Sequence, residues 1–120
     1  MDKIRQRLSE LGYSVYDAPA PVGSYVQCVR TGNLLHLSGG ISVNGEDKYF
    51  GKVGQDLTVE EGQAAARAAI LNRLAVIVQA VGSLEKVSRI VAVNGFVTAG
   101  PGFYDHPKVL TGASALLVDA

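Results

Sequence analysis

The segment Ser38-Gly39-Gly40 carries the strongest signal for chemistry in the sequence, because it places a hydroxyl and two glycines directly after a short apolar run. Glycine amides, with no Cβ beside them, let a ligand approach the backbone and can donate hydrogen bonds to a carboxylate. Tyr25 begins the preceding β-prone run, and its amphipathic ring is suited to line the same site. These four residues predict a small-molecule site. A simple β-bulge at the glycines and a surface-packed tyrosine are the alternatives.

Other reactive side chains are better explained by structure than by catalysis. Cys28 shares a strand face with Val26, and a lone buried cysteine usually behaves as a small hydrophobic residue. His36 and His106 stand outside any His, Asp or Glu cluster with the spacing of metal ligands, so we expect no metal site. Asp105 is adjacent to His106, but successive helix residues point about 100° apart, so Asp105 is interpreted as a helix cap.

Composition and charge indicate one folded domain. The chain has 120 residues, and domains typically hold roughly 100 to 200. Hydrophobic residues make up 48% and charged residues 18%, which is too apolar for a disordered chain. Eleven Lys and Arg balance eleven Asp and Glu, and this neutrality weighs against avid nucleic-acid binding.

The sequence also indicates where the protein works. Its single cysteine, Cys28, cannot form an internal disulfide, and the N-terminus interleaves charged with apolar residues in a way no signal peptide does. We therefore expect a cytoplasmic protein. Arg67, Arg73 and Gln79 interrupt the most apolar helix, so we expect no membrane span.

Local patterns predict the elements that position the glycine segment. Ile4, Leu8 and Leu11 fall on one stripe of a short helix that Gly12 can close. A proline loop over residues 18–23 follows. Residues 25–29 and 34–38 are β-prone on either side of a tight turn at 30–33, which predicts a hairpin. Further loops are expected at 44–54 and 100–107.

A long helix and a final strand and helix complete the prediction. Thr58 and Glu61 form a capping box, and an apolar stripe continues to Val81, so a helix is expected over residues 60–81 with Gly82 as its stop. Residues 87–98 are β-branched and apolar on both faces, which favours a covered central strand. A second helix is expected from Asp105. This order predicts a two-layer α+β sandwich.

The order of these motifs is distinctive: the proline loop with its tyrosine over 18–27, then Gly32-Asn-Leu-Leu-His-Leu-Ser-Gly-Gly40, then a long helix carrying Asn72 and the strand at 91–97. In this combination the chain resembles the Rid family, also called YjgF or L-PSP-like proteins, from about Asp17 onward. The N-terminal helix, a glycine near position 45 and Val109-Leu-Thr-Gly-Ala-Ser114 make it similar to the longer variants of the family.

The resemblance implies a chorismate-mutase-like α+β fold, with a mixed sheet, two helices on one face and a short N-terminal helix. It also implies a homotrimer whose sheets form a barrel-like core, with ligand clefts between subunits. The implied reaction is hydrolysis of an enamine or imine, such as 2-aminoacrylate, to a 2-keto acid and ammonia, without metal or organic cofactor. Carried over by motif, Tyr25 lines the cleft, Ser38 and Gly39 form its floor, and Thr111 lies where active members often have Asn.

Two features of the family have no counterpart in the 120 residues. They are the carboxylate-binding arginine that follows the second helix and the acidic residue of the last strand. Without the guanidinium, a charge-assisted pair worth roughly 1.5 to 3 kcal/mol is lost. We therefore expect a single domain over residues 1–120 that lacks its C-terminal strand or strands, leaves an apolar sheet edge for another segment to cover, and is a poor deaminase without the arginine segment.

Three functions stay open from the sequence. The first is a Rid-type imine deaminase acting on a small-molecule imine. The second is a non-catalytic regulatory trimer that senses a small carboxylate. The third, endoribonuclease activity, is sometimes attached to the family by name, but zero net charge and the lack of a basic cluster with aromatic residues disfavour a nucleic-acid partner.

Overall fold

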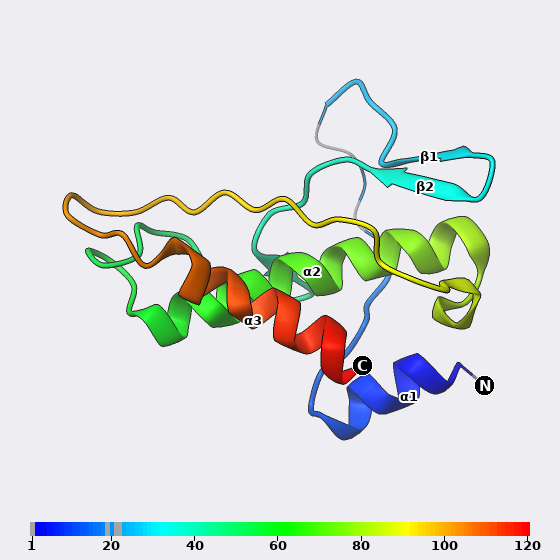
Figure 1. Ribbon diagram of the computed structural model, residues 1–120, viewed down its shortest axis with the longest axis horizontal. Helices are drawn as coiled ribbons and strands as arrows, with labels where there is room; N and C mark the ends of the chain where they lie inside the picture. The colour runs from blue at the N-terminus through cyan, green and yellow to red at the C-terminus, as the bar shows by residue number, and fades with distance from the viewer. Residues whose placement is uncertain (1, 19, 21–22) are drawn as a thin grey trace.

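The computed structural model describes residues 2–18, 20 and 23–120, which form three α-helices, one 3-10 turn and two short β-hairpins (Figure 1). In chain order the elements are α1 (Lys3–Glu10), β1 (Cys28–Thr31), β2 (Leu34–Leu37), β3 (Val43–Asn44), β4 (Asp47–Lys48), α2 (Val59–Val81), η1 (Leu84–Lys86) and α3 (His106–Asp119). The expected α+β class and the short N-terminal helix are confirmed. Much of the predicted proline loop, at residues 19, 21 and 22, lies outside the described residues.

Helix α2 is the centre of the fold. The predicted capping box is present: the Glu61 amide donates to Thr58 Oγ1 at 3.1 Å, and the Thr58 amide donates to Glu61 Oε1 at 3.0 Å. Gly82 ends the helix with a left-handed φ of 89°, as expected. Among the described residues, α2 is the one helix long and apolar enough to cross a membrane by length and composition, a test that the core helix of a folded domain also passes.

Helix α3 packs along α2, and the two backbones approach closely at Gly112 (Figure 1). A Cβ built on Gly112 would lie 2.9 Å from the Cα of Gln63, closer than real Cβ contacts allow. The Gln63 side chain also joins the helices, because its Nε2 donates to the carbonyl of Lys108 at 2.9 Å. Only glycine therefore permits this crossing.

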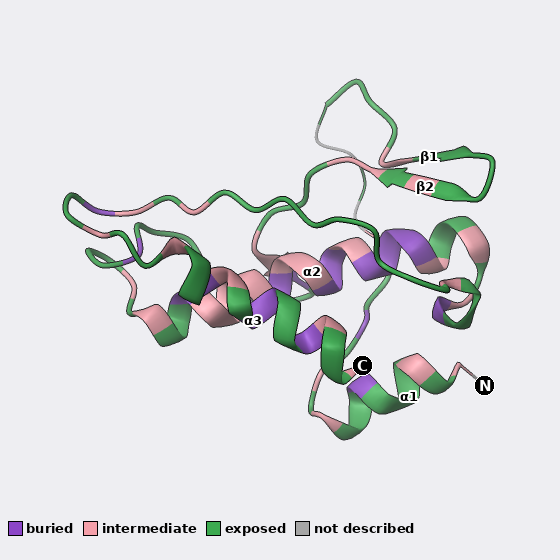
Figure 2. Ribbon diagram, in the orientation of Figure 1, coloured by how far each residue is buried: buried purple, intermediate pink, exposed green. Residues whose placement is uncertain are grey.

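The core joins all three helices and the 3-10 turn (Figure 2). Leu8 of α1 and Leu84 of η1 are almost completely buried, and they pack in one cluster with Leu74 of α2 and Leu116 of α3. A second link is polar, because Arg7 Nε donates to the carbonyl of Asp119 at the end of α3. The predicted apolar stripes of α1 and α2 are thus confirmed as core faces.

The predicted first hairpin is present, but its first strand spans Cys28–Thr31 instead of residues 25–29, so Tyr25 precedes the strand and Arg30 and Thr31 belong to it and not to the turn. β1 and β2 are antiparallel in a register that pairs Thr31 with Leu34, so Gly32 and Asn33 form a two-residue turn. Just beyond the ladder, the amide of Ser38 still donates to the carbonyl of Gln27 at 2.9 Å. The open end of this hairpin lies over α2, which β1 contacts.

The expected loop at 44–54 contains a second ladder. β3 and β4 pair antiparallel, with Asn44 opposite Asp47. The prediction missed these strands because two residues are too few to show an alternating pattern. A mixed sheet was expected, whereas the ladders of the described residues are antiparallel and the only parallel contacts are isolated bridges from Val53 to Leu57 and to Ala99.

The prediction of a covered central strand at 87–98 is wrong for the single protomer. This stretch, called the extended segment below, runs alongside the helices without joining either ladder (Figure 1). Val87 and Val97 are half-buried, but most apolar side chains between them are solvent-exposed, with Val91 at 75% and Phe96 at 96% of their full accessibility (Figure 2). The pattern correctly indicates extended backbone, but strand pairing also needs a neighbouring backbone, and among the described residues only Val53, next to Thr98 at the end of the segment, supplies one.

Asp105 occupies the cap position of α3 but does not cap it with its side chain. Its φ of −86° and ψ of 37° lie outside the extended region that capping residues adopt, so the carboxylate does not accept from the first helical amides. The carbonyl of Asp105 accepts instead from the amides of Lys108 and Val109. Pro107 fits in the first turn, where its missing N–H costs nothing.

Candidate functional site

The guanidinium of Arg73 connects α2 to both sides of the open end of the β1–β2 hairpin. Its Nη1 donates to the carbonyl of Ser38 at 3.1 Å and to Ser38 Oγ at 3.2 Å. Its Nη2 donates to Gln27 Oε1 at 2.8 Å and to Asn72 Oδ1 at 2.5 Å, and Nε donates to the same Asn72 oxygen at 3.1 Å. We call these four residues the Arg73 cluster.

Helix α2 places Arg73 among buried neighbours, and the direction that remains for its side chain is toward the hairpin. Leu71 and Leu74 beside it are buried, and Asn72 is only 5% exposed. Asn72 is itself fixed, because its Nδ2 donates to the carbonyl of Val43 at 2.9 Å. The arginine side chain therefore extends from the core face of α2 toward the hairpin, half-buried and held along its length.

No charged group balances Arg73 among the described side chains. Their one ion pair within 4.0 Å joins Arg7 and Glu10 on α1, far along the chain from this cluster. All the acceptors around Arg73 are neutral amide, hydroxyl or carbonyl oxygens. Burial lowers the pKa of Arg73, while the nearby phenol of Tyr25 raises it by a smaller amount. The site therefore carries a net positive charge, since an arginine is not deprotonated in proteins.

Three hydrogen-bond donors at the cluster have no acceptor among the residues that the structure describes. A hydroxyl has one hydrogen and two lone pairs, and Ser38 Oγ accepts from Arg73, so its hydrogen is left to donate elsewhere. Within the described part of the chain, neither this hydroxyl nor the amides of Gly39 and Gly40 donate to another protein group. These donors follow one another along three consecutive residues, and two of the three are exposed.

The two glycines differ in what surrounds them. A Cβ on Gly39 would meet no atom within 4 Å, so the backbone there is open to a ligand. A Cβ on Gly40 would collide with Nε of Arg73 and lie 2.9 Å from its Cδ. Gly39 thus keeps the site accessible, and Gly40 makes room for the arginine.

A groove of about 590 Å³ adjoins the cluster between the hairpin and α2. It is lined by Tyr25, Gln27 and Cys28 on one side and by Val76, Gln79 and Ala80 on the other. Gln27 belongs to both the groove and the cluster, and Arg73 lies one helical turn before Val76 on the same face of α2. Volumes of roughly 300 to 1,000 Å³ hold small-molecule ligands in proteins, and a few polar groups on a mostly apolar wall are typical of such sites.

The structure brings together most of the predicted site residues. Ser38 and Gly40 contact Arg73, Gly39 lies between them in the chain, and Tyr25 is near enough to raise the pKa of Arg73. Thr111 is elsewhere: it is exposed on α3, and its Oγ1 donates to the carbonyl of Pro107 at 2.9 Å. No contact among the described residues links it to the cluster, so its place in the site stays a prediction.

The remaining reactive side chains are accounted for locally. Cys28 is a half-buried free thiol at the edge of the groove, and His36 is exposed on β2. The His106 ring packs edge-on against Phe103, with centroids 5.5 Å apart. In the described ranges, no three His, Cys, Asp or Glu side chains gather closely enough to hold a metal ion.

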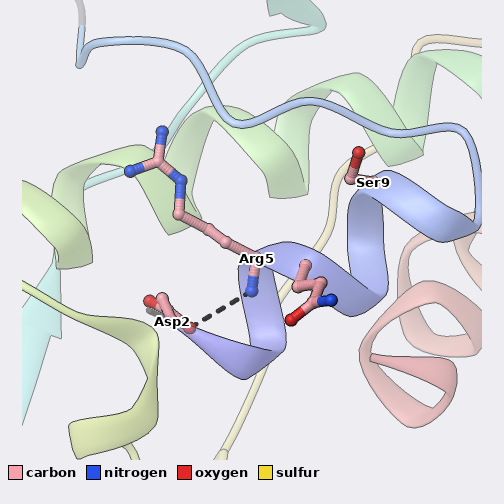
Figure 3. Close-up of a pocket in the computed structure, with 4 residues that line it drawn as sticks. Asp2, Arg5 and Ser9 are labelled. Carbon is pink, nitrogen blue, oxygen red and sulfur yellow. Dashed lines mark hydrogen bonds between the residues drawn. The ribbon is translucent and has the colours of Figure 1, made fainter.

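A second hollow lies on α1, lined by Asp2, Arg5, Gln6 and Ser9 (Figure 3). Its charged groups are already engaged in structure. The Asp2 carboxylate accepts from the amide of Arg5, as Figure 3 shows, and Nη2 of Arg5 donates to the carbonyl of Val15 at 2.8 Å. Both charged groups that line this hollow therefore serve the local structure of α1 and the loop that follows it.

Sequence reasoning missed Arg73 and Gln27 as site residues. One signal was present, because an arginine inside an otherwise apolar helix must find hydrogen-bond acceptors or remain exposed. Arg73 had been interpreted only as an interruption of a membrane span. Nothing local distinguishes Gln27, whose role depends on a partner 46 residues away.

Comparison with known proteins identifies the family of the chain and its fold. Residues 5–120 match the protein family described as "YjgF/chorismate mutase-like, putative endoribonuclease". A relative, Protein TCP17 from Trypanosoma cruzi, is 38% identical over 117 residues, which make up 97% of this chain and 73% of that protein.

Two crystal structures have the same fold. One, described as a "putative endoribonuclease" from Shewanella oneidensis MR-1, has a TM-score of 0.90 and 35% identity, covering 97% of this chain and 78% of that one. The other, a protein of unknown function from Agrobacterium tumefaciens, has a TM-score of 0.85 and 37% identity, covering 97% of this chain and 72% of that one. With a family match across nearly the whole chain and the same fold in both relatives, the chain belongs to the YjgF/chorismate-mutase-like family.

Proposed function

We propose that the protein hydrolyses small reactive imines or enamines that carry a carboxylate, releasing a 2-keto acid and ammonia. The observation that carries this proposal is the set of three free donors at Ser38, Gly39 and Gly40 beside a groove of small-molecule size. Consecutive donors of this kind are suited to hold a carboxylate or a developing oxyanion. Membership of the family adds the reaction class as an analogy.

The proposed reaction needs placement more than a strong acid or base. An enamine substrate first tautomerises to the imine, gaining a proton at its β-carbon and losing one from nitrogen. Water then adds to the imine carbon, the C=N π electron pair moves to nitrogen, and a proton from the water completes a carbinolamine. The hydroxyl then gives its proton to the nitrogen, ammonia leaves, and the C=O bond forms. In this scheme the free donors hold the substrate, and the phenol of Tyr25 positions the water, so that orientation supplies most of the rate increase.

A Ser38→Ala variant of the full chain tests the proposal. We expect keto acid release from enzymatically generated 2-aminoacrylate to fall by about tenfold to a hundredfold, the loss expected for a hydrogen bond to a charged group. Ser114→Ala is the matched control, since Ser114 is exposed on α3 and donates only to the carbonyl of Leu110. If the wild-type protein releases keto acid no faster than the spontaneous reaction, the deaminase proposal fails.

The exposed extended segment supports a further part of the proposal, that the protein works as a homotrimer. A run of apolar side chains including Ile90, Val91, Val93 and Phe96 is open to solvent in the protomer. Isolated apolar residues on a surface are ordinary, but a contiguous row on an unpaired strand marks an interaction site. Light scattering on the purified protein should give three times the protomer mass, and a monomer at all concentrations would contradict the assembly.

Endoribonuclease activity is the second candidate, because the family description and the Shewanella relative carry that name. The zero net charge disfavours it, since RNA binding relies on neutralising phosphates. We expect a single-stranded RNA to stay intact with protein purified through its oligomer peak. Cleavage that co-elutes with the protein and disappears in Ser38→Ala would put this candidate first.

A further inference from the structure

Arg73 is costly to keep where it stands, and its position requires an explanation. A half-buried charge destabilises the fold unless an opposite charge compensates it, and no carboxylate among the described side chains does so. An amide side chain could donate to some of these neutral acceptors without bringing a charge into the site. A positive charge at this point therefore serves something outside the protomer's own packing.

The geometry also shows how the charge can act. Five donated hydrogen bonds engage Nε, Nη1 and Nη2, all with protein oxygens, so the guanidinium has no free fork to offer a ligand. One of those bonds ends on Ser38 Oγ, which turns the hydroxyl hydrogen outward as a donor. The positive potential of Arg73 therefore acts at the donors of Ser38, Gly39 and Gly40, which lie next to its guanidinium in the chain segment that it binds.

We propose that Arg73 makes this site select negatively charged ligands, by placing an uncompensated positive charge behind Ser38 and by holding the Ser38 hydroxyl as an outward donor. Arg73 is thus a positioning residue, and the group it recognises through Ser38 is a small carboxylate. The proposal rests on the proposed function for the identity of the site, but it concerns charge selection and does not require turnover.

Binding measurements with a charged and a neutral probe separate charge selection from general damage. The probes are 2-oxobutanoate and its neutral amide, 2-oxobutanamide, titrated into wild type, Arg73→Met and Arg73→Lys. We expect Arg73→Met to weaken 2-oxobutanoate binding by about tenfold or more, as for loss of a charge-assisted interaction, with amide binding unchanged within about twofold. Arg73→Lys, which keeps the charge with a shorter reach, should recover part of the loss.

Two controls define the mechanism. Arg67→Met removes a positive charge from the same helix, where Arg67 lies over the Tyr13 ring at 6.0 Å, and it should bind both probes like wild type. In a Ser38→Ala background, Arg73→Met should cost less than it does alone, because part of its effect passes through Ser38.

Distinct outcomes overturn the two proposals. Equal loss of both probes in Arg73→Met, unchanged 2-oxobutanoate binding, or a wild type that prefers neither probe would each overturn charge selection by Arg73. A wild type that prefers the carboxylate, loses that preference in Arg73→Met and yet hydrolyses no imine would keep this inference and remove the deaminase function. Should Arg73→Met fail to fold, Arg73→Lys is compared with Arg67→Lys. The quantity compared is the ratio of the affinity for 2-oxobutanoate to the affinity for 2-oxobutanamide. A lower ratio in Arg73→Lys than in Arg67→Lys is expected, and equal ratios would overturn charge selection by Arg73.

Discussion

Gly39 and Gly40 are neighbours whose missing side chains serve different purposes. A Cβ at position 40 would collide with an arginine that five hydrogen bonds hold in place, whereas a Cβ at position 39 would meet only solvent. The Arg73 side chain cannot move aside without giving up those bonds. Two substitutions of equal size are therefore expected to have unequal effects.

Gly40→Ala should destabilise the protein by about 1 to 3 kcal/mol, the usual cost of an added methyl group in a packed site. Gly39→Ala should change the free energy of unfolding by less than about 0.5 kcal/mol, as for other open surface positions. Both should weaken 2-oxobutanoate binding, Gly40→Ala through Arg73 and Gly39→Ala by covering the open backbone. Urea unfolding with ligand titration checks this, and equal stabilities of the two variants would contradict it.

At the residue scale, the sequence predicts the donors but not the charge behind them. Ser38 and its two glycines are adjacent in the chain, so their chemistry can be identified locally. Arg73 lies 35 residues from Ser38, and only the packing of α2 under the hairpin brings them together. Hydrophobic periodicity and turn residues report only on neighbours in the sequence, so they cannot predict a tertiary contact of this kind.

At the scale of elements, the confirmed predictions depend on residues close in the sequence, and those that depend on distant contacts are not confirmed. The capping box of α2 and the two-residue turn of the first hairpin involve residues within four positions of one another, and both are confirmed. The apolar pattern of the extended segment is local and predicts a covered strand. Covering that strand needs residues distant in the chain, which the pattern does not reveal, and the segment joins neither ladder. Asp105 is wrong as a side-chain cap because its backbone lies outside the extended region, and a residue type in a pattern does not determine the backbone angles at that position.

One carboxylate ties the first element to the 3-10 turn. Asp2 Oδ1 accepts from the amides of Ile4 and Arg5 at the start of α1, and Oδ2 accepts from Ser83 Oγ and the amide of Leu84. Partial burial raises the pKa of Asp2, but the four hydrogen bonds, led by that of Leu84, outweigh it and hold the pKa below the ordinary 3.8. The ionised form is thus favoured in the folded state.

This shift predicts a pH-dependent contribution to stability. A carboxylate whose folded pKa is depressed stabilises the protein fully above its unfolded pKa of 3.8 and loses that contribution as the pH falls through the folded pKa. Asp2→Ala should cost about 0.5 to 2 kcal/mol at pH 7, the range for loss of a helix cap, and the gap from wild type should narrow below the unfolded pKa. Urea unfolding across pH measures the gap. Ser9→Ala, on the same helix, should show no such narrowing.

The crossing of α2 and α3 depends on a single absent side chain. A Cβ at Gly112 would press on the backbone of α2 at Gln63, and a helix backbone cannot rotate away as a side chain can. Gly112→Ala should therefore destabilise by about 1 to 3 kcal/mol or more, despite alanine's better helix propensity. Ala115→Ser, on the exposed side of α3, is the control and should stay within about 0.5 kcal/mol of wild type. A stabilised Gly112→Ala would mean that the helices separate more easily than this contact implies.

At the scale of the whole molecule, the extended segment is the feature that a single protomer leaves incomplete. Hydrogen bonds fix the two ends of the segment. The Val87 amide donates to the carbonyl of Leu84, and the carbonyl of Thr98 accepts from the Val53 amide. Between these points, the amides of residues 88–97 donate to no acceptor among the described residues. Both its apolar side chains and its backbone polar groups therefore lack partners among the described residues, and the strand pairing between copies proposed above would supply them.

Hydrogen exchange of these amides provides the last prediction. In an isolated protomer, amides 88–97 should exchange at nearly the rate of unfolded chain, because no hydrogen bond among the described residues protects them. If copies of the chain pair there, protection should appear and should increase with protein concentration, as mass action requires. Phe96→Asp, which places a charge on the most exposed large hydrophobic residue, should shift both the protection and the measured mass toward the monomer. The amides inside α2 supply the internal reference, because their bonds lie within one helix and should stay protected in either state. Fast exchange at 88–97 in a preparation that light scattering shows to be trimeric would place the contact between copies on another face.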